Sequence, residues 1–247
     1  MSDRIAIVTG SGQGLGEEIA IALAERGYKL ALFGRTAAKI ERVAARIGGG
    51  TLPIALDLTD PDAVRAAFNQ VEDRLGALDV LVNNAATYVP FLIADATDEQ
   101  IRTTIDGSLV SALYCIREAI RRMRPHGSGD IVSISSESVR YPAPLLSVYA
   151  AAKAGLAKIH EALRRELHDS GIRPMIFETG RIDSSSAGEH WPPEMVEEFM
   201  RRFETLGYSG PLARDAATAR TLAATIVHMI ESPRDAVFEL VQMRAVN

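Results

Sequence analysis

Hydrophobic and polar positions alternate along this chain in two rhythms. Short, almost continuously apolar runs are typical of strands buried on both faces, and they alternate with longer segments whose apolar residues recur at helical spacing. The apolar runs predict strands at residues 4–9, 29–34, 51–56, 79–82, 130–135, 173–178 and 237–242. The amphipathic segments predict helices near residues 15–26, 36–47, 60–75, 97–123, 147–169 and 213–231.

Local signals mark several helix ends. The Asp-Pro pair at 60–61 opens the third helix, because aspartate caps the first N–H groups and proline suits the first turn. Thr97 and Gln100 have the spacing of a capping box. Gly27 and Gly76 stand just past predicted helix ends, where a left-handed backbone is needed.

The order of the elements predicts the fold class. Strands separated by helices must pair in parallel, since a tight hairpin cannot return the chain in the same direction. We therefore expect an α/β fold: a Rossmann-like, doubly wound parallel sheet of about seven strands with helices on both faces and a site at the strand carboxyl ends. No linker or repeat interrupts residues 1–247, so a single domain is expected. The long interval 183–212 predicts a lid, with apolar residues at helical spacing at Met195, Phe199, Phe203 and Leu206.

Composition narrows the function classes. A net charge of −5 without long like-charge runs argues against nucleic-acid binding. The single cysteine excludes an internal disulfide, and the five histidines show no metal-ligand spacing. No apolar stretch approaches the roughly 18 residues of a membrane helix, and the early first strand leaves no room for a signal peptide. We expect a cytoplasmic protein with no metal, nucleic-acid or membrane partner.

A glycine-rich loop follows the first predicted strand. In residues 9–16 (TGSGQGLG), Gly10 allows a tight turn, Gly14 a close backbone approach to a diphosphate, and Gly16 close helix–strand packing. The helix N-terminus that follows favours the negative charge of such a group. The alternative is a glycine-rich loop that merely precedes a helix. Its position directly after the first strand favours a dinucleotide site.

Tyr149 and Lys153 form a second candidate site. The chain has only four lysines against 23 arginines, and one of them lies four residues after a tyrosine in SVYAAAK, residues 147–153. On a helix these two side chains share one face. The alternative is a tyrosine that packs on a lysine stem, and the pattern taken alone does not decide between the two.

Four motifs together resemble the short-chain dehydrogenase/reductase family. They are the Gly-x-x-x-Gly-x-Gly loop, NNAA at 83–86, ISS at 134–136 and YAAAK at 149–153, in the family's order along essentially the whole chain. Ser136 lies thirteen residues before Tyr149, the family's usual gap. The resemblance implies an NAD(P)-dependent enzyme that interconverts a small-molecule carbonyl and an alcohol. It also implies a homodimer or homotetramer.

The resemblance assigns roles to the catalytic residues. Tyr149 acts as general acid in carbonyl reduction and as base in the reverse reaction. The pKa of a free phenol is about 10, and we expect the adjacent ammonium of Lys153 to lower it. Lys153 also binds the nicotinamide ribose. Ser136 holds the substrate oxygen and stabilises the charge that develops on it.

The resemblance also implies a cofactor site assembled from several loops. In it Asn83 braces the strands beside the cofactor, Asp57 meets the adenine, and the segment after Gly180 contacts the carboxamide. The full set is Gly10, Gly12, Gln13, Gly14, Leu15, Gly16, Arg35, Asp57, Leu58, Asn83, Ala85, Tyr149, Lys153, Gly180, Ile182 and Ser184.

The end of the second strand indicates which cofactor binds. An acidic residue there binds the ribose 2′-hydroxyl of NAD, but this chain has Gly34, followed by Arg35. A guanidinium suits a phosphate, which favours NADPH over NADH. The alternative is that Arg35 only caps the next helix. Gln13 also stands where NADP-dependent members often carry a basic residue.

Two departures from the family pattern bear on activity. Ser108 stands where the family has a catalytic asparagine that helps hold a water linking Lys153 to solvent. We expect Ser108 to serve this proton path through an additional water, and Gly107 to favour a local helix distortion. Thr179 replaces a proline. The alternative is a non-catalytic dinucleotide-binding sensor or scaffold, but the retained serine, tyrosine and lysine favour an enzyme.

Three largely apolar segments, 87–91, 140–146 and 183–212, are expected to wall the substrate site. They suggest a hydrophobic or aromatic ketone or alcohol, although half of these side chains can instead pack the lid on the core. Glu137 is expected to point to solvent, as most loop glutamates do. The alternative is a carboxylate that borders the pocket.

Overall fold

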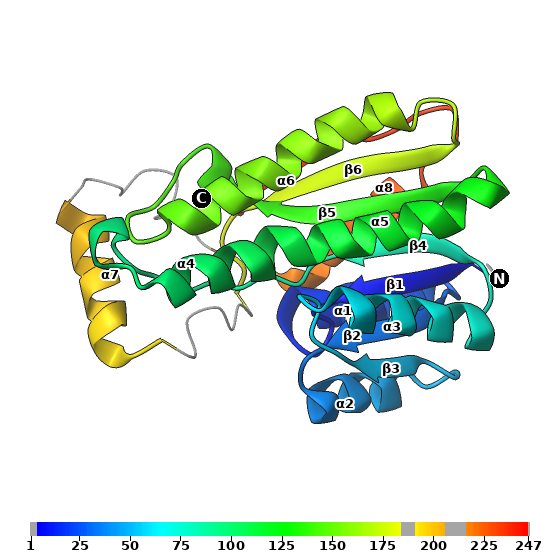
Figure 1. Ribbon diagram of the computed structural model, residues 1–247, viewed down its shortest axis with the longest axis horizontal. Coiled ribbons are helices and arrows are strands. Elements are labelled where there is room, and N and C mark those ends of the chain that lie inside the picture. The colour runs from blue at the N-terminus through cyan, green and yellow to red at the C-terminus, as the bar shows by residue number, and fades with distance from the viewer. Residues whose placement is uncertain (1–3, 184–190, 206–215, 247) are drawn as a thin grey trace.

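The structure, a computed structural model, describes residues 4–183, 191–205 and 216–246. Within them, seven strands form one parallel sheet in the order β3-β2-β1-β4-β5-β6-β7 (Figure 1). The strands are β1 (Ile5–Thr9), β2 (Lys29–Gly34), β3 (Leu52–Ala55), β4 (Leu78–Asn83), β5 (Gly129–Ser136), β6 (Ile172–Thr179) and β7 (Leu240–Met243). The α-helices are α1 (Gly14–Glu25), α2 (Ala37–Ile47), α3 (Pro61–Arg74), α4 (Asp98–Ile105), α5 (Ser111–Met123), α6 (Ser147–Glu166), α7 (Pro193–Thr205) and α8 (Ala219–Glu231).

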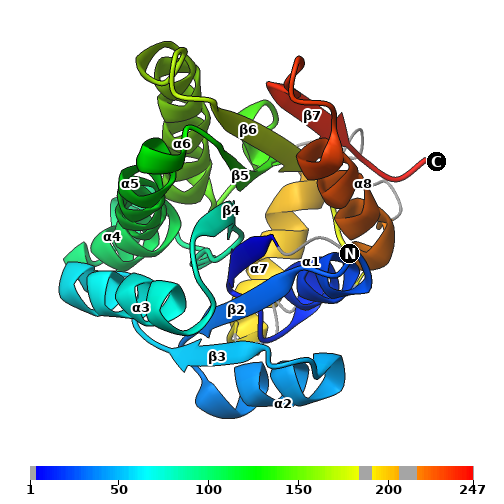
Figure 2. The same ribbon diagram turned by 90° about the vertical axis from the view of Figure 1, so that its right-hand side faces the viewer.

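Helices cover both faces of the sheet, which confirms the doubly wound fold (Figure 2). One face carries α1 and α8, and the other carries α3, α5 and α6. Neighbouring strand residues serve opposite faces because their side chains alternate: Leu32 packs in the first core and Phe33 in the second. Phe33 meets Phe68 of α3 edge to face, with 5.7 Å between ring centroids. The helix α7 stands apart from both layers, beyond the strand carboxyl ends (Figure 1).

The predicted helix ends are formed by the residues expected to form them. The Asp60 side chain accepts hydrogen bonds from two N–H groups in the first turn of α3. Thr97 and Gln100 make a complete capping box at the start of α4. Gly27 and Gly76 have φ values of 85° and 113°, a region that glycine enters without strain.

Two predicted helices differ from the structure. The expected helix 97–123 is divided by the π-helical turn η2 (Asp106–Val110) between α4 and α5. Gly107 permits this turn to pack closely, because a Cβ there would lie 2.0 Å from Oγ1 of Thr87. The last helix begins at Ala219 rather than 213, since the side chain of Thr218 caps it and the preceding residue pairs with Ile182; residues 213–215 lie outside the described part.

The last strand begins three residues later than predicted, at Leu240 rather than 237. The apolar run alone gave no sign of this shift. The guanidinium of Arg173 holds the preceding segment in a loop, because it binds the backbone carbonyls of Ser232, Pro233 and Ala236 and that of Ile230 in the last turn of α8.

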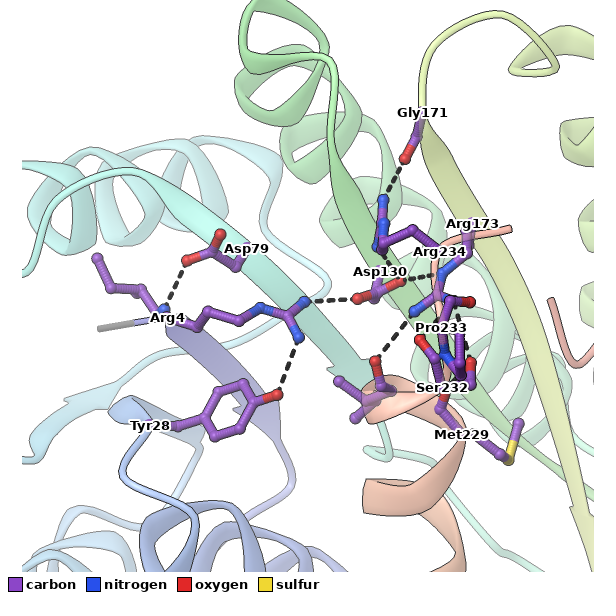
Figure 3. A network of polar contacts seen from close by, with 12 residues as sticks. Arg4, Tyr28, Asp79, Asp130, Gly171, Arg173, Met229, Ser232, Pro233 and Arg234 are labelled. Carbon is purple, nitrogen blue, oxygen red and sulfur yellow. Dashed lines mark hydrogen bonds and ion pairs between the residues drawn. The ribbon is translucent and has the colours of Figure 1, made fainter. Parts of the chain in front are cut away.

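The same arginine belongs to a polar network at the amino ends of the strands (Figure 3). Asp130, at the start of β5 and 0% exposed, lies 2.5 Å from Arg4, 2.7 Å from Arg173 and 2.9 Å from Arg234. Arg4 also donates to the hydroxyl of Tyr28. One carboxylate thereby joins the chain entering β1, strands β5 and β6, and the segment after α8. This is the end of the sheet opposite the candidate site.

Candidate active site

The glycine loop connects β1 to α1. Gly10 and Gly14 have φ values of 64° and 57°, which explains the glycines at these positions. A Cβ on Gly16 would lie 2.3 Å from the carbonyl oxygen of Gly10, so α1 packs on the loop only with glycine there. Gln13 is the N-cap of α1 and its side chain does not cap the helix. The first-turn N–H groups therefore have no side-chain cap.

The end of β4 holds this loop in place. Oγ1 of Thr9 accepts from the N–H groups of Asn84 and Ala85, both at 3.0 Å. Asn84 in turn donates to the carbonyls of Thr9 and Gly10 at 3.1 and 3.2 Å. Asn83 points the other way and donates to Ser133 of β5 at 3.4 Å. Sequence reasoning selected Asn83 and missed Asn84, although both belong to the NNAA motif.

A cleft of ≈ 1320 Å³ runs along the strand carboxyl ends from the glycine loop to α7. It brings together most of the residues expected in the site: Gly10, Gly12, Gln13, Gly14, Leu15, Arg35, Asp57, Leu58, Ala85, Ser136, Tyr149, Lys153, Gly180 and Ile182. Gly16, Asn83 and Ser108 are not among its lining residues. Ser184 lies outside the described residues.

Ser136, Tyr149 and Lys153 meet where β5 ends and α6 begins. The Ser136 side chain hydrogen-bonds that of Tyr149 and accepts from the N–H of Ser138 at 3.1 Å. Lys153 is 2% exposed and its Nζ donates to the carbonyl of Ile134 at 2.7 Å. That ammonium lies 5.8 Å from the centre of the Tyr149 ring, so the two side chains do share a helix face.

Burial is the largest influence on the pKa values of Tyr149 and Lys153. It raises the pKa of Tyr149 to about 12, against a lowering by the hydrogen bond from Ser136. It lowers the pKa of Lys153 to about 8. The expected lowering of the tyrosine pKa below that of a free phenol is therefore absent from this structure, because desolvation penalises the phenolate. A phenol that stays protonated at neutral pH is suited to donate a proton.

Ser108 lies in the π-helical turn between α4 and α5. It is 0% exposed, and its hydroxyl accepts from the N–H of Thr87 at 3.1 Å and donates to the carbonyl of Thr87 at 2.8 Å. Both contacts bind the π-helical turn to the loop after β4. The hydroxyl thus anchors the backbone next to Tyr88, and Ser108 is not among the residues that line the cleft. Its role on a proton path from Lys153 stays a prediction.

Aromatic side chains form the outer wall of the cleft. The Tyr88 ring packs edge-on against Tyr149 at 4.8 Å and stacks on Trp191 at 5.1 Å. Trp191 donates to the carbonyl of Tyr88 at 3.1 Å and meets Phe199 of α7 edge to face. The sequence left open whether these apolar side chains wall the substrate site or pack the lid on the core. The rings do both, because they attach α7 and also line the cleft.

Glu137 corrects another expectation. Its side chain is buried, 6% exposed, and lines the cleft instead of pointing to solvent. Arg244, beyond β7, lies 3.5 Å from its Oε2. A contact between residues more than a hundred positions apart gives no local signal in the sequence.

At the other end of the cleft, Gly34 ends β2 and the exposed Arg35 follows it. Lys39 of α2 also lines the cleft and donates to the side chain of Gln13. Sequence reasoning missed this lysine. Asp57 accepts from the backbone and hydroxyl of Thr59, and these bonds lower the pKa of its carboxyl.

Other kinds of site are not found in the described part of the chain. Residues 4–183, 191–205 and 216–246 contain no group of three or more histidine, cysteine or acidic side chains placed to hold a metal ion. No helix within these ranges has the length and apolar character needed to cross a membrane.

A family model described as short chain dehydrogenase matches residues 4–194. The chain belongs to this family. It is 28% identical over 195 residues to an uncharacterized oxidoreductase of Staphylococcus aureus strain MW2, covering 78% of this chain and 84% of that protein.

Solved structures of short-chain dehydrogenases share the fold. The crystal structure of such an enzyme from Streptomyces avermitilis superposes with a TM-score of 0.84 at 24% identity, covering 100% of this chain and 89% of the other. The closed form of a serine dehydrogenase complexed with NADP⁺ gives 0.85 at 22% identity, over 97% and 94% of the two chains. The family and the Rossmann-like fold expected from the motifs are thereby confirmed.

Proposed function

We propose that this short-chain dehydrogenase interconverts a carbonyl and an alcohol with a nicotinamide cofactor. The observation that carries the proposal is the meeting of Ser136, Tyr149 and Lys153 in the cleft that the glycine loop also lines. In reduction the Tyr149 hydroxyl donates a proton to the carbonyl oxygen, and in oxidation the same group removes it. Ser136 orients the oxygen and stabilises its developing charge.

The residues present fit the cofactor. The N-terminus of α1 has no side-chain cap and follows a loop whose glycines leave the backbone accessible, which suits a diphosphate. When bound, the cofactor supplies or accepts the hydride. Lys153, held by the carbonyl of Ile134, would bind the nicotinamide ribose, and Gly180 and Ile182 would flank the carboxamide.

Charge at the far end of the cleft supports NADPH as the preferred cofactor. Arg35 and Lys39 both line the cleft beside Gly34, and no acidic residue ends β2. Two cations favour a 2′-phosphate, and the serine dehydrogenase that shares this fold is described with NADP⁺. The aromatic wall supports a substrate with a hydrophobic or aromatic body. As the family resemblance implies, the chain would assemble as a homodimer or homotetramer.

Cofactor turnover tests this function. The protein is incubated with NADPH or NADH and a panel of aryl and alkyl ketones, and the absorbance of the reduced nicotinamide should fall. With the oxidised cofactors and the matching alcohols, the same absorbance should rise. NADPH should be consumed faster than NADH at equal concentration. Tight cofactor binding without turnover on any member of the panel would favour the non-catalytic sensor or scaffold instead.

Arg35→Ala should weaken the binding of NADPH but not that of NADH. A charged hydrogen bond contributes about 1.5–3 kcal/mol, so the Kd for NADPH should rise roughly 10- to 150-fold. The Kd for NADH should change little, because it lacks the 2′-phosphate. Fluorescence titration measures both. Arg65→Ala, on the outer surface of α3, is the control and should change neither value. Equal weakening toward both cofactors would show that Arg35 acts on the fold.

A further inference from the structure

A buried carboxylate stands beside the proposed catalytic serine. Glu137 opens the short helix η4 (Glu137–Val139) immediately after Ser136, and its side chain lines the cleft. The rings of Tyr88 and Tyr149, which pack edge-on at 4.8 Å, line the same cleft as Glu137. Glu137 therefore borders the cleft directly after the proposed catalytic serine.

Two neighbours hold the side chain of Glu137 in place. Arg244 lies 3.5 Å from Oε2, and its guanidinium packs over the ring of Tyr141 at 4.8 Å. A Cβ on Gly180 would lie 3.1 Å from the same oxygen, so glycine at that position gives the carboxylate room.

The cleft is also lined by the rings of Tyr88, Trp191 and Phe199, which pack on one another. Such a cleft matches a molecule with an apolar or aromatic body and a positive charge close to its reacting carbon. We propose that Glu137 recognises the substrate, and that the substrates are alcohols or ketones bearing an ammonium group on an apolar or aromatic body. This inference rests on the proposed function of the same cleft.

The same charge disfavours anions. A second carboxylate placed next to Glu137 in a poorly solvated wall is repelled more strongly than it would be in water. Arg181 also lines the cleft and attracts anions, so an anionic probe decides which charge governs recognition.

Three probes of similar size test the proposal. 2-Amino-1-phenylethanol and 1-phenyl-1-propanol carry an ammonium or a methyl group one CH2 away from the same carbinol, and mandelate carries a carboxylate bonded directly to it. Their Kd values are measured by calorimetry on the full chain with NADP⁺ at neutral pH. The ammonium probe should bind roughly 10- to 150-fold more tightly than the neutral probe, as expected for a charged hydrogen bond. Mandelate should bind most weakly. Oxidation of each probe is followed in parallel.

Glu137→Gln keeps the shape and removes the charge, so the preference for the ammonium probe should fall to about threefold or less, with little change for the neutral probe. Glu178→Gln is the matched control. Glu178 is also a buried glutamate paired with an arginine, Arg140, but it does not line the cleft, and its variant should keep the preference. If Glu137→Gln does not fold, Glu137→Asp, which withdraws the charge, should reduce the preference in part.

Several results would overturn the proposal: equal binding of the ammonium and neutral probes to the wild type, tighter binding of mandelate, or a preference that survives Glu137→Gln. If Glu137→Gln weakens the binding of all three probes equally, Glu137 is only a structural partner of Arg244. Failure of the proposed function looks different. In that case the Kd preference and its loss are observed, but neither these probes nor the wider panel are turned over.

Discussion

Tyr149→Phe is expected to abolish nearly all turnover and to leave the fold and cofactor affinity intact. Only the hydroxyl that hydrogen-bonds Ser136 is lost, while the ring keeps its edge-on contact with Tyr88 at 4.8 Å. General acid–base catalysis typically contributes about 10²–10⁴-fold, and kcat should fall by a factor in that range. The measurement is steady-state reduction of the best ketone of the panel, with the Kd for NADPH determined on the same preparation.

Tyr114→Phe provides the control for this variant. Tyr114 lies on α5, packs with Arg117 and does not line the cleft, so its hydroxyl should be dispensable for turnover. A Tyr149→Phe protein that keeps about a third or more of the wild-type kcat would disprove the assigned role. A parallel loss of NADPH affinity would instead show that the substitution disturbs the cofactor site.

Asp130→Asn should cause the largest loss of stability. The carboxylate is fully buried and contacts three arginines, of which Arg173 is itself buried (Figure 3). Removal of one partner from a buried ion pair typically costs about 3–5 kcal/mol, because it leaves charge uncompensated away from water. Urea unfolding followed by circular dichroism should show this decrease in the free energy of unfolding. The protein that remains folded should bind cofactor normally, since the cleft lies at the opposite ends of the strands.

Asp62→Asn is the matched control on the surface. Its side chain is 81% exposed and pairs with Arg65, and exposed pairs contribute about 1 kcal/mol or less. If Asp130→Asn accumulates unfolded, Arg234→Gln, which removes one partly exposed arginine, should give a smaller loss that can be measured. A loss below about 1 kcal/mol for Asp130→Asn would mean that the network does not hold the sheet together.

Most of the sheet was predictable because parallel strands buried on both faces are nearly continuous apolar runs. Strand β2 begins and ends where the pattern placed it, at Lys29 and Gly34. Strand β7 did not, because its start is set by the contacts of Arg173 with the preceding loop. The helix ends were predictable wherever a single residue type supplies the cap, as Asp60 does.

The meeting of the site motifs was also predictable in part. The carboxyl ends of parallel strands lie at one edge of a sheet, so motifs that follow β1, β4 and β5 must come together there. Tyr149 and Lys153 face one another because helical spacing places them on one side of α6. The pKa of Tyr149 was not predictable, since it depends on how deeply other segments bury the phenol.

By itself, the sequence determined the family, the order of strands and helices, and many but not all of the side chains that gather in the cleft, because these follow from local periodicity and motif spacing. The tertiary structure alone decided the environment of individual polar groups. It turned Ser108 toward Thr87, buried Glu137 against Arg244, and brought Lys39 to Gln13. Each of these contacts joins residues that are distant along the chain. The burial and charge that set such a group's chemistry arise only when the whole domain has packed.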